Sequence, residues 1–151
     1  MKRVFLGGTT ASTTWRVGLI ERLVARGVSR DQIINPHLAP GVSWTPKHME
    51  EEDRHKNDLN TIVLIVIQPA GGEDASRAEL LGPTSMYEIG RYAHSQPRRT
   101  AVVLQSELFT SGKRSRKVLE GLAAKLRKEF KGPPYFASLR AAEDWVVAQL
   151  T

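Results

Sequence analysis

The segment Thr61–Ile67 reads TIVLIVI and constrains the fold more than any other part of the chain. Every residue after Thr61 in this segment is apolar, with no alternation of apolar and polar side chains, so both faces of a strand here must be buried. Such a strand is typical of the middle of a parallel sheet that helices cover on both sides. The segment therefore predicts an α/β protein built around this strand.

Strand-like and helix-like segments alternate on either side of this one. The strand-like segments are residues 2–6, 32–35, 61–67, 100–104 and 135–136. Apolar spacing and helix-start signals predict helices over residues 15–26, 47–57, 84–94, 111–131 and 139–150. Five alternations in 151 residues predict a single domain, residues 1–151, with a flavodoxin-like three-layer α/β sandwich fold. Its five-stranded parallel sheet is expected to have the order 2-1-3-4-5.

Hydroxyl residues mark the starts of two of these helices. Thr84 or Ser85 is expected to cap the helix that runs to His94, and Ser138 to cap the last helix. In the basic helix over residues 111–131, Val118 is expected to share an inward apolar face with Leu119.

Composition narrows the function classes. The chain has no cysteine, which excludes a disulfide framework, a zinc ribbon, an iron–sulfur cluster and a cysteine nucleophile. No apolar run approaches the roughly 20 residues of a membrane helix, and no signal-peptide pattern opens the sequence. We therefore expect a cytoplasmic protein without membrane association.

The net charge of +6 is unevenly distributed, because residues 1–90 carry a net charge of −1 and residues 91–151 a net charge of +7. A basic surface attracts phosphate-bearing ligands, although a solvated lysine-rich helix is the more ordinary explanation.

The loop after the first strand is a candidate ligand site. In a parallel sheet of this order, ligands bind beyond the carboxyl ends of the strands, where the strand order reverses. Gly7, Gly8 and Thr9 lie between the first strand and a helix, and glycines let a backbone approach a ligand closely. A Cβ at Gly8 is therefore expected to block binding without disturbing the sheet. A tight turn without a ligand is an equally good explanation of these residues.

Glu88 is the strongest candidate for chemistry. It stands about one turn into the helix after the central strand, where a side chain faces the cleft at the switch point. The alternative is a capping box, because Glu88 follows Ser85 by three residues.

Two other groups of residues are candidates to bind a planar base or a metal ion. Trp15 and Trp44 are candidates for stacking on a planar base, although Trp15 fits the core equally well. His48 and His55, with Glu52 nearby, are a weak metal-site candidate on the acidic helix, and simple solvent exposure is preferred. We expect no metal ion and no other cofactor.

Several motifs occur in an order that resembles a known family. They are VFLGGT at residues 4–9, Trp15-Arg16, Asn35-Pro36, Trp44, Asn57-Asp58 and SMYEIGRYA at residues 85–93. Together they resemble the nucleoside 2-deoxyribosyltransferase-like family, over roughly residues 3–105.

The resemblance implies a flavodoxin-like fold and cleavage of the N-glycosidic bond of a 2′-deoxynucleoside or a nucleotide. It gives the role of nucleophile to Glu88 and the role of the proton-transfer aspartate to Asp58. Residues near these positions are candidates to bind the substrate. Independently of the resemblance, a 5′-phosphate is expected to dock at Ser85 and the backbone N–H groups of the helix start, with Arg16 and Arg91 close in sequence, although Ser85 could equally cap the helix or bind a 5′-hydroxyl. The substrate-binding candidates are Gly7, Gly8, Thr9, Trp15, Arg16, Trp44 and Ser85.

Alternatives remain open at this point. The acceptor is either another base or water, so the chain is a transferase or a hydrolase. The resemblance also implies a homo-oligomer. The rival readings are a non-catalytic nucleotide-binding module of the same fold and a glycohydrolase of a dinucleotide such as NAD. Nucleic-acid binding through the basic helix is a weaker idea, and we do not expect it.

Overall fold

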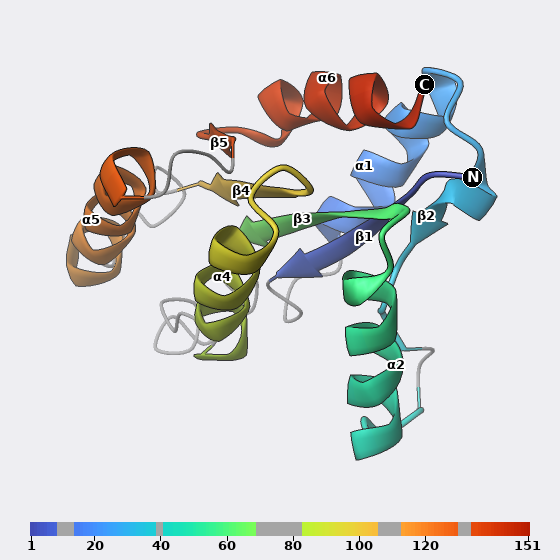
Figure 1. Cartoon of the computed structure of the whole chain (residues 1–151), viewed down its shortest axis with the longest axis horizontal. Coiled ribbons are helices and arrows are strands. Elements are labelled where there is room, and N and C mark those ends of the chain that lie inside the picture. The colour runs from blue at the N-terminus through green and yellow to red at the C-terminus, as the bar shows by residue number, and fades with distance from the viewer. Residues whose placement is uncertain (9–13, 39–40, 69–82, 106–112, 130–133) are drawn as a thin grey trace.

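The computed structural model describes residues 1–8, 14–38, 41–68, 83–105, 113–129 and 134–151 (Figure 1). Strands and helices alternate along it as the sequence predicts. The strands are β1 Arg3–Gly8, β2 Ile33–Ile34, β3 Thr61–Ile67, β4 Thr100–Leu104 and β5 Tyr135–Phe136. The helices are α1 Thr14–Ala25, the short 3-10 turn η1 Arg30–Gln32, α2 Pro46–Asn57, α4 Pro83–Ser95, α5 Lys113–Glu129 and α6 Leu139–Leu150.

The five strands form one parallel sheet of order β2-β1-β3-β4-β5, which confirms the predicted flavodoxin-like α/β fold. Strand β3 lies at its centre and is buried along its whole length. It pairs with β1 from Arg3↔Thr61 to Gly8↔Val66, so both strands end at the same edge. In sheets of this kind ligands bind beyond the carboxyl edge where the strand order reverses, which here is between β1 and β3.

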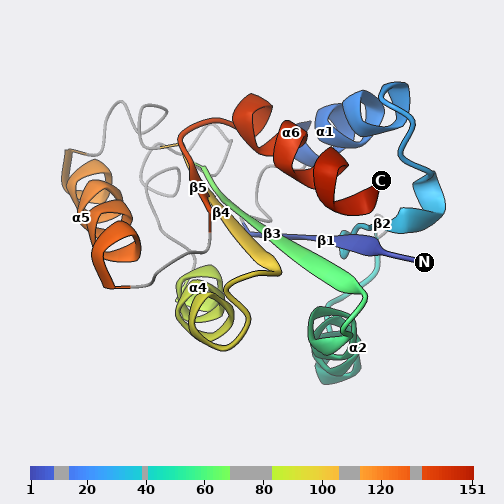
Figure 2. The ribbon, with the colours of Figure 1, turned by 45° about the horizontal axis from the view of Figure 1, so that its top comes forward.

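Helices cover both faces of the sheet. In Figure 2, α1 and α6 lie on one side and α2 and α4 on the other. Successive strand residues point to opposite faces, and so β1 contributes Val4 and Leu6 to the core under α1 and α6. Phe5 belongs to the second core, which also holds Ile89 of α4 and Leu119 of α5. The face that carries α2 and α4 is the one on which Glu88 lies.

Two expectations about the helices are wrong in detail, and one is confirmed. Helix α4 begins at Pro83, so Thr84 and Ser85 lie inside its first turn and do not precede it as caps. Val118 of α5 is exposed and not part of the inward face, although Leu119 is buried as expected. Ser138 does cap α6, since its hydroxyl accepts a hydrogen bond from the Ala141 amide.

Candidate active site

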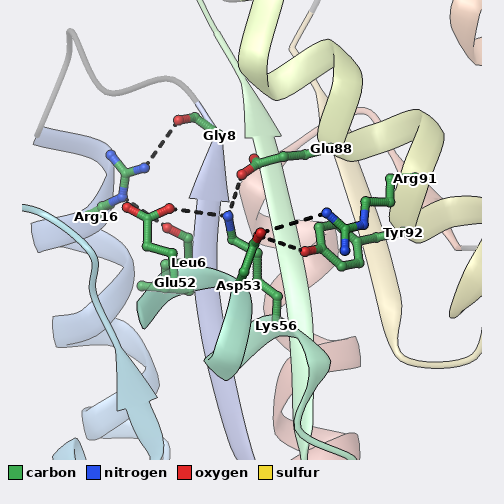
Figure 3. Close-up of polar contacts among 9 residues, drawn as sticks. All are labelled: Leu6, Gly8, Arg16, Glu52, Asp53, Lys56, Glu88, Arg91 and Tyr92. Carbon is green, nitrogen blue, oxygen red and sulfur yellow. Dashed lines mark hydrogen bonds and ion pairs between the residues drawn. The ribbon is translucent and has the colours of Figure 1, made fainter. Parts of the chain in front are cut away.

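Glu88 lies beside the carboxyl end of β1. Its side chain is only 12% exposed and projects from the second turn of α4 toward β1 (Figure 3). A Cβ built on Gly7 would lie 3.7 Å from Glu88 Oε2, which is an ordinary contact distance. The lack of a side chain at Gly7 therefore leaves room for a methyl group next to the Glu88 carboxylate. The capping-box explanation fails, because Ser85 is itself helical and the Glu88 carboxylate is bound elsewhere.

The partner of Glu88 is Lys56, in the last turn of α2. Lys56 is almost fully buried, with 4% of its side chain exposed. Its Nζ donates to Glu88 Oε1 and, at 3.1 Å, to Glu52 Oε2 one turn earlier on the same helix. Two oxygens within hydrogen-bond distance of one nitrogen lie within roughly 6 Å of each other. The structure thus holds two carboxylates close together at the carboxyl edge of the sheet.

Arg16 provides a second buried cation near the same carboxylates. Its Nε donates to the Leu6 carbonyl at 3.1 Å and its Nη2 donates to the Gly8 carbonyl at 3.3 Å, so it fastens α1 to the end of β1. Burial lowers the pKa of the Arg16 guanidinium to about 10, and the negative charges of Glu52 and Glu88 oppose that shift. Arg16 therefore both orders the end of β1 and supplies positive charge to the carboxylate pair.

A further contact joins α2 to α4 beside the pair. The Tyr92 hydroxyl donates to Asp53 Oδ1 at 3.1 Å, and Arg91 Nη1 lies 3.7 Å from Asp53 Oδ2. Burial, followed by the nearby Asp53 charge, raises the pKa of the Tyr92 hydroxyl above its ordinary value of 10. Tyr92 therefore remains a hydrogen-bond donor throughout the physiological pH range.

Four of the residues predicted from sequence meet at this edge. Glu88, Gly7, Gly8 and Arg16 lie together, as Figure 3 shows for three of them. Ser85 is buried in the first turn of α4, one turn before Glu88. Thr9 lies outside the described residues.

The expectation for Gly8 needs correction. Gly8 has φ +112°, and a Cβ there would lie 2.0 Å from the Val66 carbonyl oxygen of β3. No real Cβ tolerates such a contact, so a side chain at Gly8 must disturb the sheet. The glycine is required by the close approach of β1 and β3, whatever its part in binding.

The two tryptophans are not brought to Glu88. Trp15 is buried in the core beneath α1 and α6, on the opposite face of the sheet, with the Arg16 guanidinium 4.3 Å from its ring centre. The core explanation of Trp15 is therefore the one the structure favours over stacking on a substrate. Trp44 precedes α2 and is 50% exposed.

Asp58 has a structural role at the other edge of the sheet. It ends α2, and its carboxylate accepts hydrogen bonds from the Asn60 amide at 3.0 Å and the Thr61 hydroxyl at 3.3 Å. It also forms an ion pair of 2.5 Å with Arg3. These contacts join α2 to the first residues of β1 and β3.

The position of Asp58 argues against the proton-transfer role. Its partner Arg3 begins β1, whereas Gly7, which lies next to Glu88, is four residues farther along the strand. At about 3.3 Å per residue, these positions are separated by about 13 Å. The structure therefore does not bring Asp58 and Glu88 together. The Asn57-Asp58 motif was correctly placed at the end of the acidic helix, but helix α2 carries that end away from the crevice.

We expect Asp58→Asn to destabilise the protein in a pH-dependent way. The Asn60 amide and then the Arg3 guanidinium hold the pKa of Asp58 below its ordinary value of 3.8. A pKa that is lower in the folded than in the unfolded chain stabilises the fold at higher pH, and this contribution is lost as pH falls through the folded-state pKa. The variant should melt at a lower temperature than the wild type at pH 7, and the gap should narrow below about pH 4. Asp31→Asn, at an exposed aspartate, is the control. If the difference in melting temperature between Asp58→Asn and the wild type is the same at pH 7 and pH 3, this account is contradicted.

Sequence reasoning missed most of the residues around Glu88. The sequence suggests Glu52 only as a metal ligand and gives no prediction for Asp53, Lys56 or Tyr92. A signal was available for one pair, because Glu52 and Lys56 are four residues apart and share a helix face. Nothing in the spacing of an acidic helix says which of its charges turns inward.

No three histidine, aspartate or glutamate side chains among the described residues are grouped so as to hold a metal ion. His48 instead engages its own helix start, since its Nδ1 accepts a hydrogen bond from the Thr45 amide at 3.0 Å. No helix in the described ranges is both long and apolar enough to cross a bilayer.

Comparisons with protein-family models, curated proteins and solved structures found no match to this chain. Its function must therefore be inferred from the site and from the sequence motifs.

Proposed function

We propose that this protein cleaves or transfers at the N-glycosidic bond of a nucleoside or a nucleoside 5′-monophosphate. The observation that carries the proposal is the Glu88 carboxylate, largely buried and next to Gly7, which has no side chain, with the Glu52 carboxylate close to it. Carboxyl groups roughly 5 Å apart are typical of enzymes that break glycosidic bonds through a covalent intermediate. The sequence motifs at residues 4–9 and 85–93, which contain Gly7 and Glu88, also support this proposal because they resemble those of the nucleoside 2-deoxyribosyltransferase-like family.

In the proposed first step, a Glu88 oxygen attacks C1′ of the sugar and the bond from C1′ to the base nitrogen breaks. The electron pair of that bond goes to the base, which receives a proton. Glu88 is then an ester on C1′. In the second step, water or an acceptor base attacks C1′, releases the Glu88 carboxylate and gives up a proton.

Glu52 replaces Asp58 as the proposed proton-transfer residue. It shares Lys56 with Glu88 and lies on the helix that faces α4, whereas Asp58 is held by Arg3 at the opposite edge. Glu52 takes up a proton from solvent before the first step, gives it to the departing base, and recovers one from the attacking water or base in the second step.

The deciding experiment is incubation with a panel of nucleosides, 2′-deoxynucleosides, their 5′-monophosphates and NAD, with and without a free base as acceptor. Chromatography should show release of a base from at least one nucleoside or monophosphate. Exchange without net hydrolysis identifies a transferase, and release of base without an acceptor identifies a hydrolase. Cleavage of NAD alone moves the assignment to a glycohydrolase. No product from any compound, together with binding of one of them, favours a non-catalytic module.

Glu52→Gln and Asp58→Asn form a matched test of the proton-transfer residue. We expect Glu52→Gln to lower kcat/KM for a neutral nucleoside by about 100-fold or more, the usual cost of losing a general acid or base. Asp58→Asn should keep the wild-type rate at a temperature where it remains folded. Initial rates measured on the best substrate of the panel decide between them, and the opposite ranking restores Asp58.

A further inference from the structure

Lys56 is a buried cation for which the proposed reaction has no direct use. It reaches from the last turn of α2 across the sheet toward α4 (Figure 3). Its ammonium group contacts Glu52 on its own helix and Glu88 on α4, and it lies 4.9 Å from the centre of the Phe5 ring of β1. Three different elements therefore surround one charged group.

These contacts engage two of the three N–H donors of the ammonium group. A lysine has three N–H donors and no acceptor. Two donors are engaged by the carboxylates, and the positive charge also rests against the aromatic face of Phe5, a favourable arrangement for a cation. Lys56 thus has its main partners within the protein, and the most direct effect expected of it is on the placement of the two carboxylates.

We propose that Lys56 is the positioning residue of the site, which holds the Glu88 carboxylate beside Gly7 and keeps Glu52 close to it. This inference rests on the proposed function for its catalytic consequence, but the restraint on Glu88 is a property of the fold. Without Lys56, two carboxylates within roughly 6 Å of each other in a largely buried site would repel. Glu88 would then turn away from Gly7, or the two helices would separate.

The inference explains why the site spans two helices. Glu52 lies on α2 and Glu88 on α4, and the 25 residues between these two helices, residues 58–82, include the central strand β3. The Tyr92–Asp53 hydrogen bond ties the same helices together at one side. Lys56 is the contact that reaches the carboxylate of Glu88 itself.

The first test compares Lys56→Met with Lys56→Arg. Methionine has a similar length without charge, whereas arginine keeps the charge and the donors. We expect Lys56→Met to lower kcat by about 100-fold, the cost of misplacing a reacting group by about 1 Å, with little change in KM. Lys56→Arg should recover a substantial part of the rate. Lys47→Met, at an exposed lysine of the same helix, is the control and should keep wild-type kinetics.

Chemical rescue separates positioning from general loss of structure. Lys56→Ala removes the amine and leaves space behind it. Propylammonium, which carries N–H donors, should raise kcat of this variant at least several-fold in a saturable way. Tetramethylammonium has the same charge without donors and should not do so. Equal kcat values for Lys56→Met and the wild type, or loss of activity in Lys56→Ala that neither cation reverses, overturn the proposal.

A double-mutant cycle tests, without any measurement of activity, whether Lys56 restrains the Glu88 carboxylate. Urea unfolding of the wild type, Lys56→Met, Glu88→Met and the double variant gives the coupling between the two side chains. Lys56→Met should destabilise the wild type more than it destabilises Glu88→Met, because the wild type loses the partner of both Glu88 and Glu52, whereas Glu88→Met loses the partner of Glu52 alone. Additive effects refute the restraint. If the wild type cleaves nothing in the substrate panel, the proposed reaction fails, and a non-zero coupling still upholds the role of Lys56 in placing Glu88.

Discussion

Glu88→Gln is expected to lower kcat by about 1,000-fold or more while the protein stays folded. The amide has nearly the same shape as the carboxylate, and its oxygen can still accept a hydrogen bond from Lys56, so α4 should remain in place. It cannot attack C1′ to form a stable ester, and so the covalent step is lost. Initial rates of base release, with a thermal melt of the same sample, measure both expectations.

Controls keep this result specific to the nucleophile. Glu50→Gln, on the exposed side of α2, should retain the wild-type rate. A small carboxylate such as formate should partly restore turnover in Glu88→Ala, because it can occupy the space of the lost side chain. Retention of more than a few per cent of the activity by Glu88→Gln excludes Glu88 as nucleophile. Unfolding of Glu88→Gln instead assigns Glu88 a structural role.

Gly8→Ala is expected to destabilise the protein by about 3 kcal/mol or more, the largest effect on stability that we foresee. Gly8 has φ +112°, a conformation that costs energy for any residue with a Cβ. The added Cβ would also lie 2.0 Å from the Val66 carbonyl oxygen and 2.6 Å from the Val66 nitrogen. Both atoms belong to the backbone of β3, so relief requires the two central strands to separate. Urea unfolding measures the loss.

Gly7→Ala is the matched control for Gly8→Ala. A Cβ at Gly7 would lie 3.5 Å from Phe5 Cε1 and 3.7 Å from Glu88 Oε2, both ordinary contacts, so stability should change by no more than about 1 kcal/mol. The methyl group would occupy the space beside the Glu88 carboxylate that we assign to the sugar. Turnover should therefore fall in a variant that unfolds like the wild type. Equal stability of the two variants contradicts the steric account of Gly8, and full activity of Gly7→Ala places the sugar elsewhere.

The sequence by itself determined the architecture and pointed to four residues of the candidate site, Glu88, Gly7, Gly8 and Arg16. The fully apolar Thr61–Ile67 segment could only be buried on both faces, and five alternations of strand and helix then left few possible sheets. Once this strand is central, Glu88 in the helix after it must lie near the carboxyl edge. These inferences succeed because neighbouring residues set the apolar periodicity of an element and the chain sets the order of the elements. Tertiary packing changes neither.

Only the tertiary structure decided which charged residues surround Glu88. Lys56 lies 32 positions from Glu88, and the acidic helix around it offers several carboxylates with nothing in their spacing to rank them. The rotation of α2 turns Glu52 and Lys56 inward, while the end of the helix carries Asp58 to Arg3 at the opposite edge. Contacts between side chains on different elements depend on how those elements are rotated and packed against the sheet. The pairing of charges across α2 and α4 is therefore a consequence of packing that the order of residues alone does not specify.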